Sequence, residues 1–104
     1  MQRIGFVMRL LPGAEPEYRR RHAAVWPDML AELKAAGARN YSIFLNGSDL
    51  FGYLEVDDLG RFQAYLEASE VNARWQASMG VLIDPLTDPA TGFHRQIPEV
   101  FHLD

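Results

Sequence analysis

The segment 4–10 alternates apolar and polar residues, which is the pattern of a β-strand that covers a core with one face. Ile4, Phe6, Met8 and Leu10 fall on one side of this strand. Two further strands are predicted at 41–45 and 50–56, and the dipeptide Asn46-Gly47 between them favours a tight hairpin turn. A last strand is predicted at 99–103.

Residues 15–36 repeat their apolar positions with the period of a helix. At about 100° per residue, one stripe collects Tyr18, His22, Val25, Trp26, Met29, Leu30, Leu33 and Ala36. Pro27 lies inside this pattern, has no N–H to donate, and crowds the preceding turn with its ring. We therefore expect the helix to kink or break just after His22, which would open space beside that side chain.

Two shorter helices are predicted in the second half of the chain. One spans the apolar residues of 59–66 and follows Asp57-Asp58, whose carboxylates can cap a helix. The next follows Ser69, another capping residue, and carries one apolar face: Val71, Trp75, Met79 and Leu82. The segment 84–96 is rich in proline and glycine, and we predict an ordered loop there.

The order β-α-β-β-α-β predicts an α+β fold of the ferredoxin-like type, with one sheet and helices on one of its faces. A chain of 104 residues can build one core, so 1–104 is predicted to be a single domain. Phe44, Phe51 and Tyr53 are expected on the uncovered face of the sheet. Pairing of two such faces would give a barrel-like homodimer; the alternative is that these aromatic residues are exposed one at a time.

Composition narrows the possible partners and the compartment. The net charge is −4, and the one basic cluster, Arg19-Arg20-Arg21, is too short for a nucleic-acid surface. No apolar run approaches the roughly 20 residues that span a membrane, and the N-terminus does not have the pattern of a signal peptide. Cysteine is absent, which excludes disulfides and thiolate chemistry and fits a cytoplasmic enzyme. A neutral small molecule or another protein is the expected partner.

The first helix carries the most informative chemistry. Tyr18 and His22 are four residues apart, so their side chains lie one above the other on the face turned to the sheet. Tyr41 is expected on the sheet face opposite them. The last helix adds Arg74, Trp75 and Gln76. Aromatic walls with a few hydrogen-bonding groups are the lining expected of a sugar site, although each of these residues could also be an ordinary core or surface residue.

Other chemistries lack support in the sequence. There is no glycine-rich nucleotide-binding motif, no P-loop and no nucleophile elbow. The three histidines have no metal-ligand spacing, and His94 and His102 are expected at the surface or in a dimer contact. We therefore expect neither a cofactor nor a metal.

The ordered set of these residues resembles the L-rhamnose mutarotases over essentially the whole chain. The residues that carry the resemblance are Tyr18, Arg20-Arg21-His22, Trp26-Pro27, Gly37-Ala38, Asn40-Tyr41, Arg74-Trp75 and Glu99-Val100-Phe101. The resemblance implies a ferredoxin-like dimer that interconverts the α and β anomers of L-rhamnose. It also implies that His22 is the proton donor and that Tyr18, Tyr41 and Trp75 bind substrate.

Two positions depart from the family pattern. Gln76 stands where the family has the second of two adjacent tryptophans, and 84–92 replaces a stretch reading Asn-Pro-Asp-Asn-Ser-Pro. Both lie where the family binds its sugar. L-rhamnose is the first expectation for the substrate, and L-fucose or another 6-deoxy or pentose sugar is the alternative.

Mutarotation opens a cyclic hemiacetal, so the ring oxygen must gain a proton and the anomeric hydroxyl must lose one. A histidine with a pKa near about 6.5 can serve either role at neutral pH. We assign the acid role to His22. Tyr18, Tyr41, an acidic residue of 84–88 and water are all candidates for the base.

Two functions of other classes fit the same order of elements. The first is a dimeric ferredoxin-like monooxygenase or a module that binds haem or aromatic compounds between helices and sheet. The second is a regulatory dimerisation domain whose core is filled and has no open pocket.

Overall fold

The strand β1 (Gln2–Leu10) lies in the middle of an antiparallel sheet. On one side it pairs along its length with β3 (Asp49–Val56), which in turn pairs with the edge strand β2 (Arg39–Asn46). On its other side it pairs with two short strands, β4 (Ile83–Asp84) and β5 (Arg95–Ile97). The order β2-β3-β1-β4 is that of a ferredoxin-like sheet.

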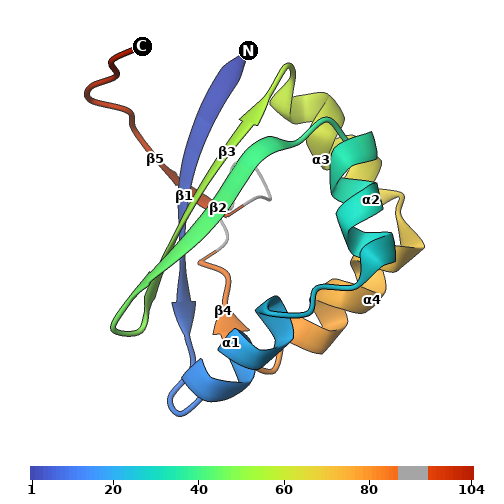
Figure 1. The fold of residues 1–104 in the computed structure, drawn as a ribbon, viewed down its shortest axis with the longest axis vertical. Helices are drawn as coiled ribbons and strands as arrows, with labels where there is room; N and C mark the ends of the chain where they lie inside the picture. Colours follow the sequence, from blue (N-terminus) through green and yellow to red (C-terminus); the bar gives the residue numbers. More distant parts are fainter. Residues whose placement is uncertain (87–93) are drawn as a thin grey trace.

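The computed structural model describes residues 1–86 and 94–104. The described residues form four helices, and all four cover the same face of the sheet (Figure 1): α1 (Glu15–His22), α2 (Pro27–Ala35), α3 (Leu59–Glu67) and α4 (Glu70–Met79). Within these described residues, no helix has the length and apolar character needed to cross a membrane. The α+β class and the placement of helices on one face are confirmed.

The predicted long helix over 15–36 is two helices. α1 ends at His22, and Pro27 is the first residue of α2, a position where the missing N–H of proline costs nothing. The break expected just after His22 is therefore confirmed. The two predicted caps of the later helices are also present, because Asp58 accepts a hydrogen bond from the Arg61 N–H and Ser69 accepts one from the Asn72 N–H.

The last strand was predicted wrongly. The fourth position of the sheet is filled by β4 and β5, whereas 99–103 carries no strand. Pro98 lacks the N–H that the pairing needs and follows directly on β5. The ion pair between Arg3 Nε and Glu99 Oε2, at 2.7 Å, holds the C-terminal segment beside β1. The central part of the predicted loop, 87–93, lies outside the described residues.

The core between sheet and helices is organised around Phe6, which has no exposed surface. Gly52 lies directly opposite Phe6 in the pairing of β1 with β3. A Cβ atom at Gly52 would overlap the Phe6 ring, so the glycine provides the space that this ring occupies. The ring of Phe6 also lies edge-on to Tyr41, with centroids 6.0 Å apart. The core thus reaches directly into the region of the predicted site.

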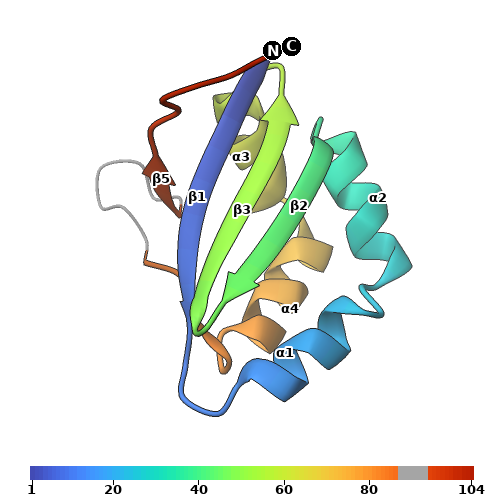
Figure 2. The same cartoon turned by 60° about the vertical axis from the view of Figure 1, so that its left-hand side comes forward.

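Among residues 1–86 and 94–104, no helix covers the other face of the sheet (Figure 2). The side chains of Val7, Phe51 and Phe44 lie in one row across β1, β3 and β2. Phe44 is 64% exposed and Phe51 37% exposed. Tyr53, in the next row, is half-buried. The sequence therefore placed these aromatic side chains on the correct face.

Candidate functional site

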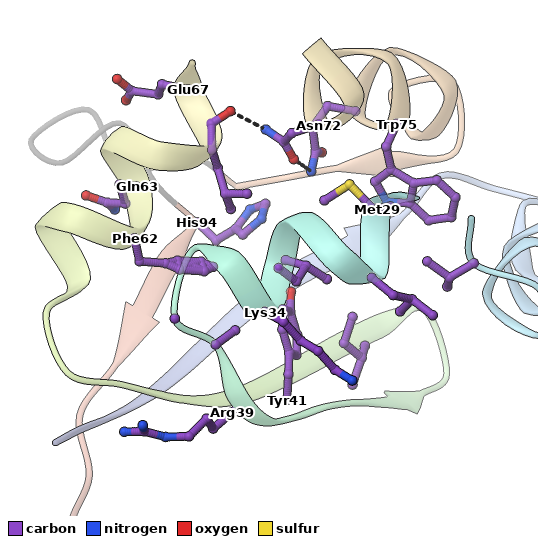
Figure 3. Close-up of a pocket in the computed structure, with 18 of the residues that line it drawn as sticks. Met29, Lys34, Arg39, Tyr41, Phe62, Gln63, Glu67, Asn72, Trp75 and His94 are labelled. Atoms are coloured by element: carbon purple, nitrogen blue, oxygen red, sulfur yellow. Dashed lines mark hydrogen bonds between the residues drawn. The ribbon is translucent and has the colours of Figure 1, made fainter. Parts of the chain in front are cut away.

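A cavity of about 1220 Å³ opens between the helices and the sheet (Figure 3). A smaller recess of about 50 Å³ continues from it toward the core. Tyr18 lines the recess, and the other four predicted site residues line both spaces: His22, Tyr41, Trp75 and Gln76. The structure thus brings these five of the predicted pocket residues together. The open cavity also excludes a regulatory domain with a filled core.

His22 is the last residue of α1, and the break before Pro27 leaves its ring at the cavity wall. Its Nδ1 lies 3.1 Å from the Tyr18 carbonyl oxygen. Because a carbonyl can only accept a hydrogen bond, Nδ1 carries the proton and donates it. In the neutral ring, Nε2 is then the basic nitrogen. No described residue hydrogen-bonds to this Nε2.

The protonation of His22 is controlled by burial. Removal from water disfavours the charged ring and lowers the pKa of His22 below its ordinary value of 6.5, and the hydrogen bond to the Tyr18 carbonyl offsets this only in part. The ring also stacks on Tyr18, with centroids 4.0 Å apart and an angle of 21°. At neutral pH His22 is therefore a neutral, oriented imidazole.

The two tyrosines are hydrogen-bond donors at neutral pH. Burial raises the pKa of Tyr18 to about 12. Burial raises the pKa of Tyr41 as well, and the charge of an ionised Tyr18 would raise it further. Neither hydroxyl can serve as a base near pH 7, because both keep their protons there.

Aromatic rings form much of the wall around His22. Trp75 of α4 meets the imidazole edge-on at 5.5 Å, and Trp26 packs edge-on against Trp75 at 5.1 Å. Tyr41 of β2 lines the same cavity and recess as His22 and Trp75. These rings offer apolar faces to the C–H groups of a ligand, while imidazole, hydroxyl and amide groups offer hydrogen bonds.

His94 was predicted wrongly. It is half-buried and lines both the cavity (Figure 3) and the recess. Its ring stacks on Phe6, with centroids 5.1 Å apart and an angle of 17°. Burial lowers its pKa too. Its position depends on β5 pairing with β1, and periodicity in the sequence gave no signal for that pairing. His102, in contrast, is outside the cavity and pairs with Asp104 at 2.8 Å, as expected of a surface residue.

Arg74 was also assigned to the pocket, and this was wrong. It is exposed and lines neither space, because its position on α4 turns it away from the sheet. Asn72, one turn before Gln76, lines the cavity instead. The four-residue spacing of these two amides was the signal that could have identified it.

The described part of the chain was also compared with the requirements of a metal site. Among residues 1–86 and 94–104, no three His, Asp or Glu side chains converge in a way that could hold a metal ion. The recess beside His22 is lined by uncharged hydrogen-bonding, aromatic and aliphatic side chains, whereas the wider cavity also has the charged side chains of Lys34, Arg39 and Glu67 in its wall. Fold and site together define a ferredoxin-like α+β protein with a pocket suited to a small polyhydroxylated ligand.

Comparison with known proteins identifies the family. The sequence model of the L-rhamnose mutarotase family matches residues 3–103 of the chain. The L-rhamnose mutarotase of Lactiplantibacillus plantarum is 43% identical over 108 residues, and that of Oceanobacillus iheyensis is 40% identical over 106; both alignments cover 100% of each chain. The chain belongs to the L-rhamnose mutarotase family, a family of isomerases that act on carbohydrates.

A solved structure agrees with this assignment. The crystal structure of an L-rhamnose mutarotase from Formosa agariphila superposes with a TM-score of 0.80 over 100% of both chains, at 26% sequence identity. The resemblance inferred from the sequence is confirmed, and with it the fold. Membership of an isomerase family sets aside the haem-binding and monooxygenase alternatives.

Proposed function

We propose that this protein interconverts the α and β anomers of L-rhamnose and that His22 carries the proton between the two oxygens of the anomeric carbon. The observation that supports this most strongly is the state of His22. Its Nδ1 is held by the Tyr18 carbonyl, and its Nε2 has no partner among the described residues at the wall of an aromatic-lined cavity. The family membership supplies the sugar.

Ring opening in the proposed reaction transfers one proton from the anomeric hydroxyl to the ring oxygen, and ring closure transfers it back. Nε2 of neutral His22 accepts the proton of the anomeric hydroxyl, the bond between the anomeric carbon and the ring oxygen breaks, and the imidazolium gives its proton to that oxygen. Both oxygens are bonded to the same carbon, so one nitrogen can reach each in turn. Rotation about the bond between C1 and C2 and the reverse steps then close the other anomer.

In this scheme His22 acts as the acid, as predicted from the sequence. It also acts as the base, for which the sequence had offered several candidates. The raised pKa values of Tyr18 and Tyr41 remove both from the candidates for a base at neutral pH. As protonated groups they are suited to donate hydrogen bonds to sugar oxygens. Acid–base help of this kind contributes on the order of 10²–10⁴ to the rate.

Trp75 and Gln76 complete the proposed substrate contacts. The Trp75 ring would pack on a C–H face of the pyranose. Gln76 offers an amide where the family pattern has a ring, which keeps L-fucose or another 6-deoxy or pentose sugar as the alternative substrate.

The experiment that tests the function is saturation transfer between the anomeric protons, measured by NMR for a panel of 6-deoxy-L-hexoses and pentoses. We expect catalytic amounts of the protein to accelerate exchange of L-rhamnose above the rate in buffer, and more than for the other sugars. Faster exchange of L-fucose than of L-rhamnose would identify L-fucose as the preferred substrate in place of L-rhamnose. Absence of acceleration for the whole panel would reject the function.

We also propose that the protein works as a cytoplasmic homodimer. The exposed row of Phe44 and Phe51 on the uncovered sheet face supports pairing with a second copy. The C-terminal segment adds exposed apolar side chains at Val100 and Phe101, 93% and 79% exposed in the single chain. The absence of cysteine fits a reducing compartment.

A further inference from the structure

The side chain of Asn72 connects the end of α3 to the start of α4 (Figure 3). Its Nδ2 donates to the Leu66 carbonyl oxygen at 3.1 Å, and its backbone N–H donates to Ser69 Oγ at 3.1 Å. Leu66 lies in the last turn of α3, and its carbonyl oxygen also accepts a hydrogen bond from the Ser69 N–H at 3.1 Å. Asn72 is therefore held at both its backbone and its side chain.

This arrangement fixes which way the Asn72 amide points. The Leu66 carbonyl can only accept, so the NH₂ group of Asn72 must face it and Oδ1 must face the other way. Gln76, one turn later, lies on that other side, with its Nε2 3.3 Å from Oδ1. Since Oδ1 can only accept, Gln76 must present its NH₂ group to Asn72. The carbonyl oxygen of Gln76, Oε1, is then turned away from Asn72.

We infer that Asn72 is a positioning residue that turns Gln76 Oε1 toward the cavity, where it accepts a hydrogen bond from one hydroxyl group of the bound sugar. This inference rests on the proposed function and specifies how the site selects its substrate. Gln76 lines both the cavity and the recess, as His22 does, so a sugar at the imidazole is within the same space. A sugar that lacks the matching hydroxyl would leave this acceptor unpaired, and the site would discriminate against it.

The test is a cycle of enzyme variants and sugars, with anomer exchange measured by NMR as a function of sugar concentration. Wild type, Gln76→Leu, Asn72→Leu and the double variant are each measured with L-rhamnose and with its 2-, 3- and 4-deoxy analogues. In wild type, one analogue should show a kcat/KM about threefold to tenfold below that of L-rhamnose, the size expected of one neutral hydrogen bond. In Gln76→Leu this difference between the two sugars should disappear. For L-rhamnose, the variant should have a higher KM than wild type and the same kcat.

The Asn72 variants test positioning. Asn72→Leu should raise the KM for L-rhamnose by about twofold to fivefold in the wild-type background and should have no effect in the Gln76→Leu background. Gln63→Leu is the matched control, because Gln63 lines the same cavity and has no link to Asn72. When combined with Gln63→Leu, Asn72→Leu should raise the KM for L-rhamnose by the same factor as in the wild-type background. Asn72→Ala replaces Asn72→Leu if the latter does not fold, as judged by circular dichroism.

Equal losses for Asn72→Leu in the two Gln76 backgrounds would show a purely structural role and overturn the inference. Equal use of all three deoxy sugars by wild type and Gln76→Leu would overturn it too. Both results leave mutarotation itself standing. Absence of acceleration by wild type with every sugar would instead reject the proposed function, and the inference with it.

Discussion

At the scale of single residues, the chemistry of the site follows from what holds one imidazole. The Tyr18 carbonyl fixes the proton on Nδ1 of His22, and burial keeps the ring neutral. The helical spacing of Tyr18 and His22 predicted that they would be adjacent, since residues four apart share a helix face. The placement of His94 could not be predicted in this way, because it depends on strand pairing between segments distant in the chain.

The lowered pKa of His22 has a consequence for the pH dependence of exchange. In the proposed scheme the neutral ring takes the first proton, so kcat/KM for L-rhamnose should rise with pH through an inflection below 6.5 and be level around pH 7. The measurement is anomer exchange by NMR from pH 4.5 to 8, with the buffer-catalysed rate subtracted.

His94 provides the control for this profile, because burial lowers its pKa in the same direction. The variant His94→Gln should keep the acidic limb. Loss of that limb would assign the titration to His94, and a rate that falls as the pH rises from 5 to 7 would mean that the charged form of His22 starts the reaction.

At the scale of elements, two local features shape the cavity. Pro27 breaks the long helical pattern into α1 and α2 and places His22 at a helix end. Gly52 makes room on β3 for the ring of Phe6, which contacts Tyr41 and His94. The break was predictable, since proline has a defined effect on a helix. The role of Gly52 was not, because it depends on the register between β1 and β3.

Gly52→Ala should lower the free energy of unfolding by about 1–3 kcal/mol, because the new methyl group overlaps the buried Phe6 ring. Urea denaturation measures this, and exchange activity should fall as the Phe6 ring shifts against Tyr41. The matched control is Gly60→Ala in α3, whose methyl group would meet only the Asp58 carboxylate, at 3.3 Å. That change should leave stability equal or improved. Equal stability of the two variants would contradict the packing proposed for Phe6.

At the scale of the whole molecule, the order of elements in the sequence predicted one sheet with helices on one face. The aromatic residues that do not face these helices, Phe44, Phe51 and Tyr53, lie on the other face of the sheet. The error at 99–103 arose because apolar content alone suggested a strand, while Pro98 blocks continued pairing. These residues instead extend the exposed apolar surface beside β1. A second copy of the chain is the proposed cover for this surface.

Phe44→Asp tests this cover. The wild-type chain should sediment with the mass of two chains, and Phe44→Asp should sediment as one, because a charge would have to be buried without a partner. Val81→Asp is the control, since Val81 is 69% exposed and lies outside the sheet; it should remain a dimer. A wild-type protein that sediments as a single chain would contradict the proposal.

The most direct test of the account is anomer exchange of L-rhamnose by His22→Gln, compared with wild type at equal protein concentration. The variant retains a hydrogen-bonding side chain, so the fold, checked by circular dichroism, and sugar binding, checked by ligand-observed NMR, should be kept. We expect the catalysed exchange rate to fall by on the order of 10²–10⁴. A folded His22→Gln protein that exchanges the anomers at the wild-type rate would contradict the central claim.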